Sequence, residues 1–250
     1  MGKNKLAKFA EMEILPNVFQ PTREEVFRQD YHLKGRWGTA VFGNDHPIVL
    51  EVGCGKGEYT VGLAKHFPEK NFIGLDIKGA RMWTGAKIAH EENIKNAVFL
   101  RTHAEDMSSI FGEGEIAEIW ITFPDPQMAK ARKRLTGCRF LSLYSHILQK
   151  DGLIHLKTDS PFLYQYTREV IRMNALPRLV ETEDLYATEK KDPILGIQTF
   201  YEQQWLARGK SIKYLCFALK ERQTFIEPDI EIEKDDYHSE ARFMSKSIQK

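Results

Sequence analysis

The chain has 250 residues, of which 42% are hydrophobic and 28% charged, and its formal net charge is +1. These proportions are ordinary for a globular protein and exclude fibrous and intrinsically disordered classes, and the length fits one large domain. No apolar run approaches the ~20 residues of a membrane span, and the three cysteines have an odd count and no zinc spacing. We therefore expect a reduced, cytoplasmic protein with no membrane segment and no metal site.

Residues 1–47 precede the first clear strand, and they are predicted to form an N-terminal extension that is partly mobile. They combine a short basic start with two proline breaks. At the other end, acidic side chains outnumber basic ones seven to four from Glu227 onward. The segment 221–250 is therefore predicted to be an acidic, flexible tail.

Apolar runs of strand length alternate with longer segments of helical periodicity between residues 48 and 220. This alternation is typical of βαβ units around a parallel sheet. It predicts strands at 48–53, 71–76, 97–101, 116–122 and 152–158, and helices at 57–67, 79–93, about 137–150 and 161–174. Two later runs, near 178–183 and 212–219, are predicted to add an antiparallel edge. The expected fold is Rossmann-like α/β, with a mostly parallel sheet, an antiparallel C-terminal edge and helices on both faces.

The first predicted strand runs directly into a glycine loop, Gly53-Cys-Gly55-Lys-Gly57, and a helical pattern follows at once. Glycines are needed in such a tight turn because they adopt unusual backbone angles and let the chain approach a ligand closely. Asp76 ends the next strand, where a carboxylate accepts hydrogen bonds from both ribose hydroxyls. Together these residues predict a nucleoside pocket.

Glu51 distinguishes between the nucleosides that this loop could hold. A dinucleotide site has glycines spaced G-x-G-x-x-G and binds a pyrophosphate at the helix N-terminus, whereas the spacing here is G-x-G-x-G. A carboxylate at position 51 repels pyrophosphate but suits S-adenosylmethionine, which carries an ammonium and a sulfonium and no phosphate. The charges favour the methyl donor over a nicotinamide cofactor; a tight turn with a helix-capping acid and no ligand is the alternative.

The loop after the third predicted strand reads Arg101-Thr-His103-Ala104-Glu105-Asp106. Methyltransferases usually place adenine against this loop, and Glu105 or Asp106 is a candidate acceptor for its exocyclic amine. Either acid serves equally well in the first turn of a short helix, so both interpretations stay open.

The fourth predicted strand stops at Pro124-Asp125-Pro126, at the crevice where open α/β sheets bind ligands. Prolines on both sides restrict Asp125 to an extended backbone and aim its carboxylate in a narrow range of directions. A basic cluster follows at Lys130, Arg132, Lys133 and Arg134, with Arg139 beyond it. Its position predicts phosphate contacts, with a solvated charged face as the alternative.

Four motifs in this order resemble one family. They are Glu51-Val-Gly-Cys-Gly-Lys-Gly57, Phe123-Pro-Asp125-Pro126, Lys157-Thr-Asp159 and Thr199-Phe200-Tyr201-Glu202. From about Gly35 to Leu219 the chain is similar to the bacterial tRNA (guanine-N7-)-methyltransferases, which have the class I methyltransferase fold and use S-adenosylmethionine. The resemblance implies methylation at N7 of a guanine in the tRNA variable loop, which forms 7-methylguanosine.

The resemblance also implies which residues bind. Contacts with S-adenosylmethionine are expected from the glycine loop and from Glu51, Asp76, His103, Ala104, Glu105 and Asp125. Contacts with tRNA are expected from Asp159 and across Thr199, Phe200, Tyr201 and Glu202. The chain departs from the family at His103, where the family has an aspartate, and at 127–129, where the family has a Trp and a Lys. Ala129 is carried over as a position near the substrate, without a side-chain role.

Guanine N7 carries a lone pair and no proton, so methyl transfer to it needs no general base. The catalytic task is to hold the base in place and to stabilise the developing cation, and Asp125 is the candidate for orienting guanine through its N1 and N2 hydrogens. Asp159 and Glu202 are expected to assist from the other side of the crevice. Local alternatives are a helix cap at Asp159 and a capping box that joins Thr199 to Glu202.

Three other classes of protein are weighed against this interpretation. A nicotinamide-dependent oxidoreductase conflicts with Glu51 and the glycine spacing. An enzyme that methylates exocyclic amines places an aromatic residue after its Asp-Pro-Pro or Asn-Pro-Pro run, whereas Gln127 follows Asp125-Pro126 here. The third class is a non-catalytic RNA-binding subunit. The sequence gives no sign of an obligate protein partner, so a monomer or a homodimer is expected.

Overall fold

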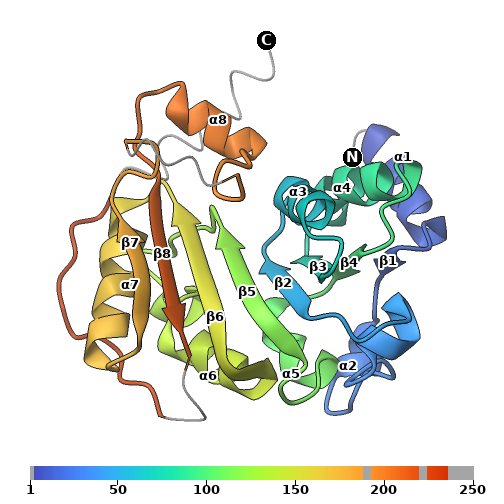
Figure 1. Cartoon of the computed structure of the whole chain (residues 1–250), viewed down its shortest axis with the longest axis horizontal. Helices are drawn as coiled ribbons and strands as arrows, with labels where there is room; N and C mark the ends of the chain where they lie inside the picture. Colours follow the sequence, from blue (N-terminus) through green and yellow to red (C-terminus); the bar gives the residue numbers. More distant parts are fainter. Residues whose placement is uncertain (1–2, 188–192, 220–223, 236–250) are drawn as a thin grey trace.

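A computed structural model of the chain describes residues 3–187, 193–219 and 224–235 (Figure 1). The described strands form one sheet in the order β1-β4-β3-β2-β5-β6-β8-β7. They are β1 (Val18–Phe19), β2 (Ile48–Val52), β3 (Asn71–Asp76), β4 (Ala97–Arg101), β5 (Ile116–Thr122), β6 (Leu148–Thr158), β7 (Arg178–Thr182) and β8 (Lys213–Ala218). The α-helices are α1 (Lys3–Ile14), α2 (Arg23–Val26), α3 (Glu58–His66), α4 (Gly79–Glu91), α5 (Met107–Ile110), α6 (Cys138–Ile147), α7 (Pro161–Met173) and α8 (Phe200–Leu206).

The sheet is parallel from β1 to β6, and β8 and β7 close it as an antiparallel edge. This confirms the predicted fold. Among the predicted strands, the largest difference between predicted and observed bounds is at the start of β6, which begins at Leu148 rather than at 152. The pairing of β5 with β6 shifts register between Ile116 and Glu118, so the ladder is irregular near the start of β6. Residues 148–150, predicted as the end of the preceding helix, belong to β6 instead, because α6 ends at Ile147.

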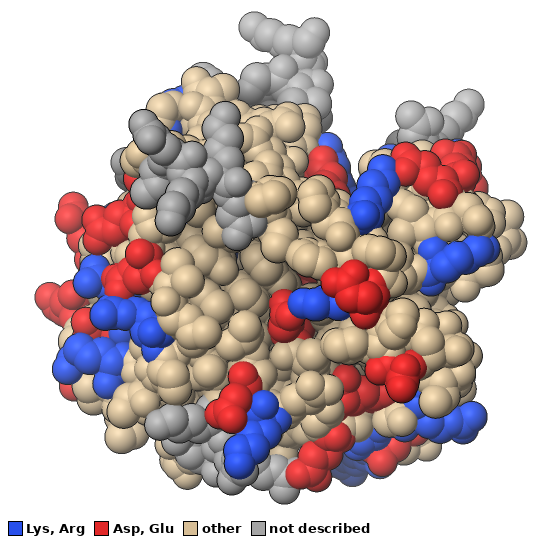
Figure 2. All heavy atoms as spheres, in the orientation of Figure 1, with Lys and Arg blue, Asp and Glu red and all other residues tan. Residues whose placement is uncertain are grey.

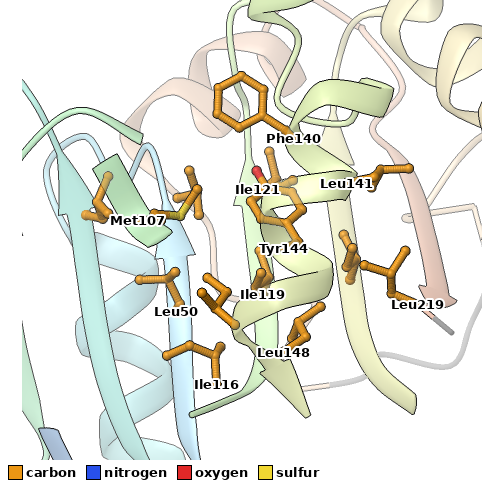
Figure 3. Packing of buried hydrophobic residues seen from close by; sticks show 14 of the residues in the cluster. Leu50, Met107, Ile116, Ile119, Ile121, Phe140, Leu141, Tyr144, Leu148 and Leu219 are labelled. Atoms are coloured by element: carbon orange, nitrogen blue, oxygen red, sulfur yellow. The ribbon is translucent and has the colours of Figure 1, made fainter. Parts of the chain in front are cut away.

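Helices cover both faces of the sheet. On one face, α3 and α4 pack with α1 over a cluster that includes Tyr59, Leu63 and Met82. On the other face, α5, α6 and α7 cover a cluster in which Leu141 and Tyr144 point toward strand residues (Figure 3). The apolar residues of α6 recur at helical spacing along one stripe, which explains why this helix packs flat on the sheet.

The segment predicted as an N-terminal extension is part of this sheet. Strand β1 pairs in parallel with β4, with Val18 opposite Phe99. Trp37 is fully buried, and its indole nitrogen donates to the backbone oxygen of Ile110 at 3.1 Å. A strand of two residues is too short to give an alternating pattern, so the sequence offered no signal for it.

The described part of the acidic C-terminal segment, residues 224–235, runs along the outside of α7 (Figure 1). Asn174 clamps the backbone of Ile226, accepting from its nitrogen at 2.7 Å and donating to its oxygen at 3.0 Å. Further along, the Tyr166 hydroxyl donates to Glu227, and the Ser160 hydroxyl donates to Asp235. The predicted tail also includes 220–223 and 236–250, which lie outside the described residues.

Within the described residues, no helix combines the length and apolar character needed to cross a membrane. Within the same ranges, no group of three or more His, Cys, Asp or Glu side chains is arranged to hold a metal ion.

Candidate active site

Four of the predicted site carboxylates lie at the carboxyl edge of the parallel strands. The strand order reverses at β2, with β3 and β4 on one side and β5 and β6 on the other, and this is the point at which open α/β sheets bind ligands. Glu51, Asp76, Asp125 and Asp159 all lie at or just beyond the ends of these strands. Helix α8 stands above this edge in Figure 1, and Figure 2 shows a notch in the upper outline beside it, bordered by acidic and basic side chains.

The glycine loop between β2 and α3 adopts the backbone that its sequence predicts. Gly53, Gly55 and Gly57 all have positive φ, at 81°, 58° and 73°. A Cβ at Gly57 would lie 2.4 Å from the ring of Phe99. Glycine is therefore required there both for its backbone angles and for its lack of a side chain.

Asp76 joins the end of β3 to the glycine loop. Its Oδ2 accepts a hydrogen bond from the Gly55 nitrogen at 2.9 Å, and its Oδ1 accepts from the Lys78 nitrogen at 2.7 Å. An ionised carboxylate has about four acceptor positions, so these two bonds orient it and leave capacity for two ribose hydroxyls. Its contact with a ribose stays a prediction.

Glu51 lies on the floor of the site with a side chain that is almost completely buried, at 2% exposure. Its Oε1 accepts from the Thr122 hydroxyl at 2.6 Å, and its Oε2 accepts from the Thr60 nitrogen at 2.9 Å and from the Thr60 hydroxyl. All three donors are neutral. Burial raises the pKa of Glu51 to about 7, although these hydrogen bonds lower it. Neither threonine was predicted from the sequence, although the polar Thr122 at the end of an apolar strand was an available signal.

The loop after β4 turns back as a short 3-10 helix, Ala104–Asp106, and continues into α5. His103 precedes this turn and is exposed, while Ala104 and Glu105 are half-buried. Glu105 lies 3.8 Å from Arg139, with both side chains partly exposed, a pairing that contributes little to stability. Both acids do occupy a first helical turn, as the local alternative predicts, and they do so at the edge where adenine is expected.

Asp125 is exposed at the end of β5 on a backbone with two unusual residues. Phe123 and Gln127 have φ of 49° and 48°, in the left-handed region that residues other than glycine rarely adopt. Asp125 Oδ1 accepts from the Gln127 nitrogen at 2.9 Å, and the Phe123 nitrogen donates to the Lys157 oxygen at 2.8 Å. Such strain is held at functional sites by the surrounding structure, and here it fixes the direction of one carboxylate.

The predicted basic cluster divides into two kinds of residue. Lys130, Arg132 and Lys133 are exposed, which agrees both with phosphate contacts and with a solvated charged face, and Ala129 lies exposed beside them. Arg134 instead donates to the backbone oxygen of Met128 at 2.8 Å. Its guanidinium also lies 4.3 Å from the centre of the Tyr166 ring and 4.8 Å from that of Phe162. Arg134 therefore supports the loop that carries Asp125.

Asp159 follows β6 and is buried at 3% exposure. The N-cap of α7 is Ser160, whose hydroxyl accepts from the Leu163 nitrogen at 3.1 Å. The alternative that made Asp159 the cap is therefore wrong. Asp159 instead lines a cavity of about 490 Å³, with Lys210 and Lys213 among the other lining residues.

Helix α8 begins with the capping box that was left open as an alternative. The Thr199 hydroxyl accepts from the Glu202 nitrogen, and the Glu202 carboxylate accepts from the Thr199 nitrogen. The first turn of α8 also contacts the glycine-loop region: the Phe200 nitrogen donates to Glu58 at 3.0 Å. The Lys56 ammonium lies 3.4 Å from the centre of the Phe200 ring. The motif from Thr199 to Glu202, which is far from the glycine loop in sequence, thus lies beside that loop.

The fold is similar to that of solved methyltransferases. The 16S rRNA methyltransferase KamB superposes with a TM-score of 0.56 at 13% identity, over 72% of this chain and 91% of that one. The 30S ribosomal A1408 methyltransferase from an uncultured bacterium gives 0.52 at 16% identity, over 73% and 91%. The fold is therefore that of the class I methyltransferases.

Sequence relatives narrow this class. A family model described as "Putative methyltransferase" matches residues 45–215. The tRNA (guanine-N(7)-)-methyltransferase of Porphyromonas gingivalis is 59% identical over 91% of this chain and 95% of its own length. That of Bacteroides thetaiotaomicron is 53% identical over 100% and 99%. The chain belongs to the tRNA (guanine-N7-)-methyltransferase family, as its motifs predicted.

Proposed function

We propose that this chain transfers a methyl group from S-adenosylmethionine to N7 of a guanine in the variable loop of tRNA, forming 7-methylguanosine. The observation that carries the proposal is the row of carboxylates at the carboxyl edge, from Asp76 through Glu51 to Asp125, around a glycine loop in the left-handed conformation. Relatives that carry this activity in their names align over nearly the whole chain.

The chemistry of the donor set fits S-adenosylmethionine. When bound, this cofactor supplies an electrophilic methyl group on a sulfonium. Asp76 has acceptor capacity for the ribose hydroxyls, and Glu51, whose hydrogen-bond donors are all neutral, offers a negative charge to the ammonium. The 3-10 turn at Ala104–Asp106 provides the wall for adenine. A pyrophosphate would meet the Glu51 carboxylate at close range, which again disfavours a dinucleotide.

Asp125 is proposed to orient the guanine. Its exposed carboxylate offers the acceptors that the N1 and N2 hydrogens of guanine need, and its turn with Gln127 keeps the carboxylate in place. A negative charge beside the purine also favours the cation that develops as N7 is methylated. No residue has to remove a proton from N7, so Asp125 acts by position and charge.

The exposed cations after Asp125 are proposed to bind tRNA phosphates. Replacing Arg132 and Lys133 with Ala is expected to lower tRNA affinity about tenfold at low salt. It should also reduce the slope of log affinity against log salt by about 2, because each phosphate contact releases counterions. Lys95→Ala, at the opposite edge of the sheet, is the matched control and should leave the slope unchanged. An unchanged slope in the double variant would return these two residues to the solvated-face interpretation.

The proposed function is tested by incubating the chain with labelled S-adenosylmethionine and unmodified tRNA, and then analysing the nucleosides. 7-Methylguanosine is the expected product, and a different methylated nucleoside overturns the proposed acceptor. Calorimetric titration with the cofactor separates the enzyme from a non-catalytic RNA-binding protein, since the latter gives no heat. Using tRNA transcripts with a substituted variable-loop guanine identifies the target position.

A further inference from the structure

A buried ion pair lies behind the first turn of α8. Lys157 on β6 and Glu202 on α8 have completely buried side chains, and the Lys157 Nζ lies 2.8 Å and 2.9 Å from the two Glu202 oxygens. The same ammonium donates to the backbone oxygens of Leu195 at 2.7 Å and Ile197 at 3.1 Å. The Tyr186 hydroxyl donates to Glu202 Oε1 at 2.6 Å. The Lys157 ammonium thus joins β6, the 194–197 loop and α8.

Both members of this pair are surrounded by partners. Glu202 accepts from Tyr186 at Oε1 and from the Thr199 nitrogen at Oε2, and the Lys157 ammonium lies within 2.9 Å of both oxygens. The three donor positions of Lys157 are filled by Leu195, Ile197 and Glu202 itself. Glu51 differs, because it has three donors and none of them is charged. Because the Glu202 side chain is also completely buried, an RNA base does not reach its carboxylate.

The side chains that the first turn of α8 presents outward are aromatic. Phe200 is 37% exposed, with the Lys56 ammonium over its ring. The half-buried Tyr201 lies edge to face with it at 5.7 Å between ring centres, and Arg81 lies 5.6 Å from the Tyr201 ring. Aromatic faces bordered by cations suit a nucleic acid, since the bases stack on the rings and the phosphates meet the cations.

Helix α8 depends on tertiary contacts for its position. It has seven residues, and isolated helices shorter than about 12 residues are marginal in water. Besides the capping box, its first turn is held by the Phe200 nitrogen with Glu58 on the outside, and by Glu202 with Lys157 and Tyr186 on the inside. Loss of the inner contact leaves a buried charge and releases this turn.

We propose that Glu202 is a positioning residue that acts on tRNA only through α8, and that Phe200 is the residue of this motif that contacts the RNA. Lys157 and Glu202 hold the first turn of α8 beside the glycine loop, and Phe200 there offers a stacking face to the target guanine or to a base next to it. This inference rests on the proposed function, because it assigns roles within the tRNA-binding half of the same site.

The double variant Glu202→Gln with Lys157→Met distinguishes a positioning role of Glu202 from a direct contact with RNA. Glu202→Gln keeps the capping box, because Gln serves at the third helical position as Glu does, but it leaves Lys157 buried without its counter-charge. Lys157→Met leaves Glu202 in the same state. Removing one member of a buried pair is strongly destabilising because it leaves an uncompensated buried charge, and replacing both members removes that charge. We expect each single variant to raise KM for tRNA at least about tenfold and the double variant to return it to within about threefold of wild type.

A direct contact from Glu202 to RNA predicts the opposite result, since the double variant lacks the carboxylate as fully as Glu202→Gln does. A double variant that is folded by thermal unfolding and no better than Glu202→Gln overturns the positioning role. If a single variant does not fold, the comparison of the double variant with wild type still decides between the two roles. A wild-type chain that forms no 7-methylguanosine overturns the proposed function, and this inference with it.

The stacking role is tested at Phe200 itself. Phe200→Ala is expected to raise KM for tRNA about tenfold, with unchanged affinity for S-adenosylmethionine and an unchanged unfolding temperature, and Phe200→Trp should restore KM. Phe27→Ala is the matched control, because Phe27 is also exposed and also bordered by cations, Arg23 and Arg28, but lies beside α2. Equal KM values for Phe200→Ala and wild type overturn the assignment.

Discussion

Asp125→Asn is expected to lower kcat for methyl transfer to tRNA by at least about a hundredfold, the usual cost of removing a group that stabilises charge in the transition state. The asparagine oxygen can keep the hydrogen bond from the Gln127 nitrogen, so the turn stays in place. The second carboxylate oxygen becomes an NH2 group, and this donor would face the N1 and N2 hydrogens of guanine. The change therefore removes both an acceptor and the negative charge.

The same variant is expected to bind S-adenosylmethionine with little change, because Asp76 and Glu51 remain. Single-turnover kinetics with saturating cofactor measures the loss in the chemical step, and calorimetric titration measures cofactor affinity. Asp30→Asn, an exposed aspartate paired only with Lys34 in the described structure, is the control and should retain wild-type rates. Full activity of Asp125→Asn would remove Asp125 from the mechanism.

The parts of the site that depend on local sequence could be predicted from it. The glycine loop requires positive φ at closely spaced positions, and the glycines at those positions indicate this directly. The capping box at Thr199 and Glu202 was also visible, because a Thr three residues before a Glu is a local signal. The parallel strands were readable as buried apolar runs, since both faces of the sheet are covered.

The parts that depend on strand order could not be predicted. Thr122 meets Glu51 because β5 lies next to β2 in the sheet, although 71 residues separate them in the chain. Lys157 stands out only as a cation in the apolar run 152–158, and nothing local identifies Glu202 as its partner. Arg134 was grouped with its basic neighbours because sequence spacing does not reveal that α7 supplies two rings beneath it.

Glu51 gives the second large effect, a pH dependence of cofactor binding. Burial raises its pKa to about 7, so about half of the unliganded protein carries a neutral Glu51 at that pH. An ammonium beside Glu51 favours the ionised form and lowers this pKa in the complex. Binding of S-adenosylmethionine at pH 7 should therefore release about half a proton, and the affinity should fall about tenfold from pH 8 to pH 6.

Proton release is measured by calorimetric titration in two buffers that differ in ionisation enthalpy. The apparent binding enthalpy should differ between the buffers for the wild-type chain and agree for Glu51→Gln, which has no proton to release. Glu51→Gln should also bind the cofactor at least about tenfold more weakly at pH 8, where the wild-type carboxylate is ionised. Buffer-independent heats for the wild-type chain would contradict the placement of the ammonium at Glu51.

The stability of the unliganded protein should respond to pH in the opposite direction. Because folding raises the pKa of Glu51 from its ordinary 4.5, the folded state binds more protons than the unfolded state between pH 4.5 and about 7. The contribution of this group to the free energy of unfolding is fully present below 4.5 and is lost as the pH rises through 7. The stability difference between wild type and Glu51→Gln should therefore shift against the wild type as pH increases, while cofactor affinity improves. A buried carboxylate that is destabilising when empty and ionised is what a site for a cationic ligand requires, because the ligand supplies the missing counter-charge.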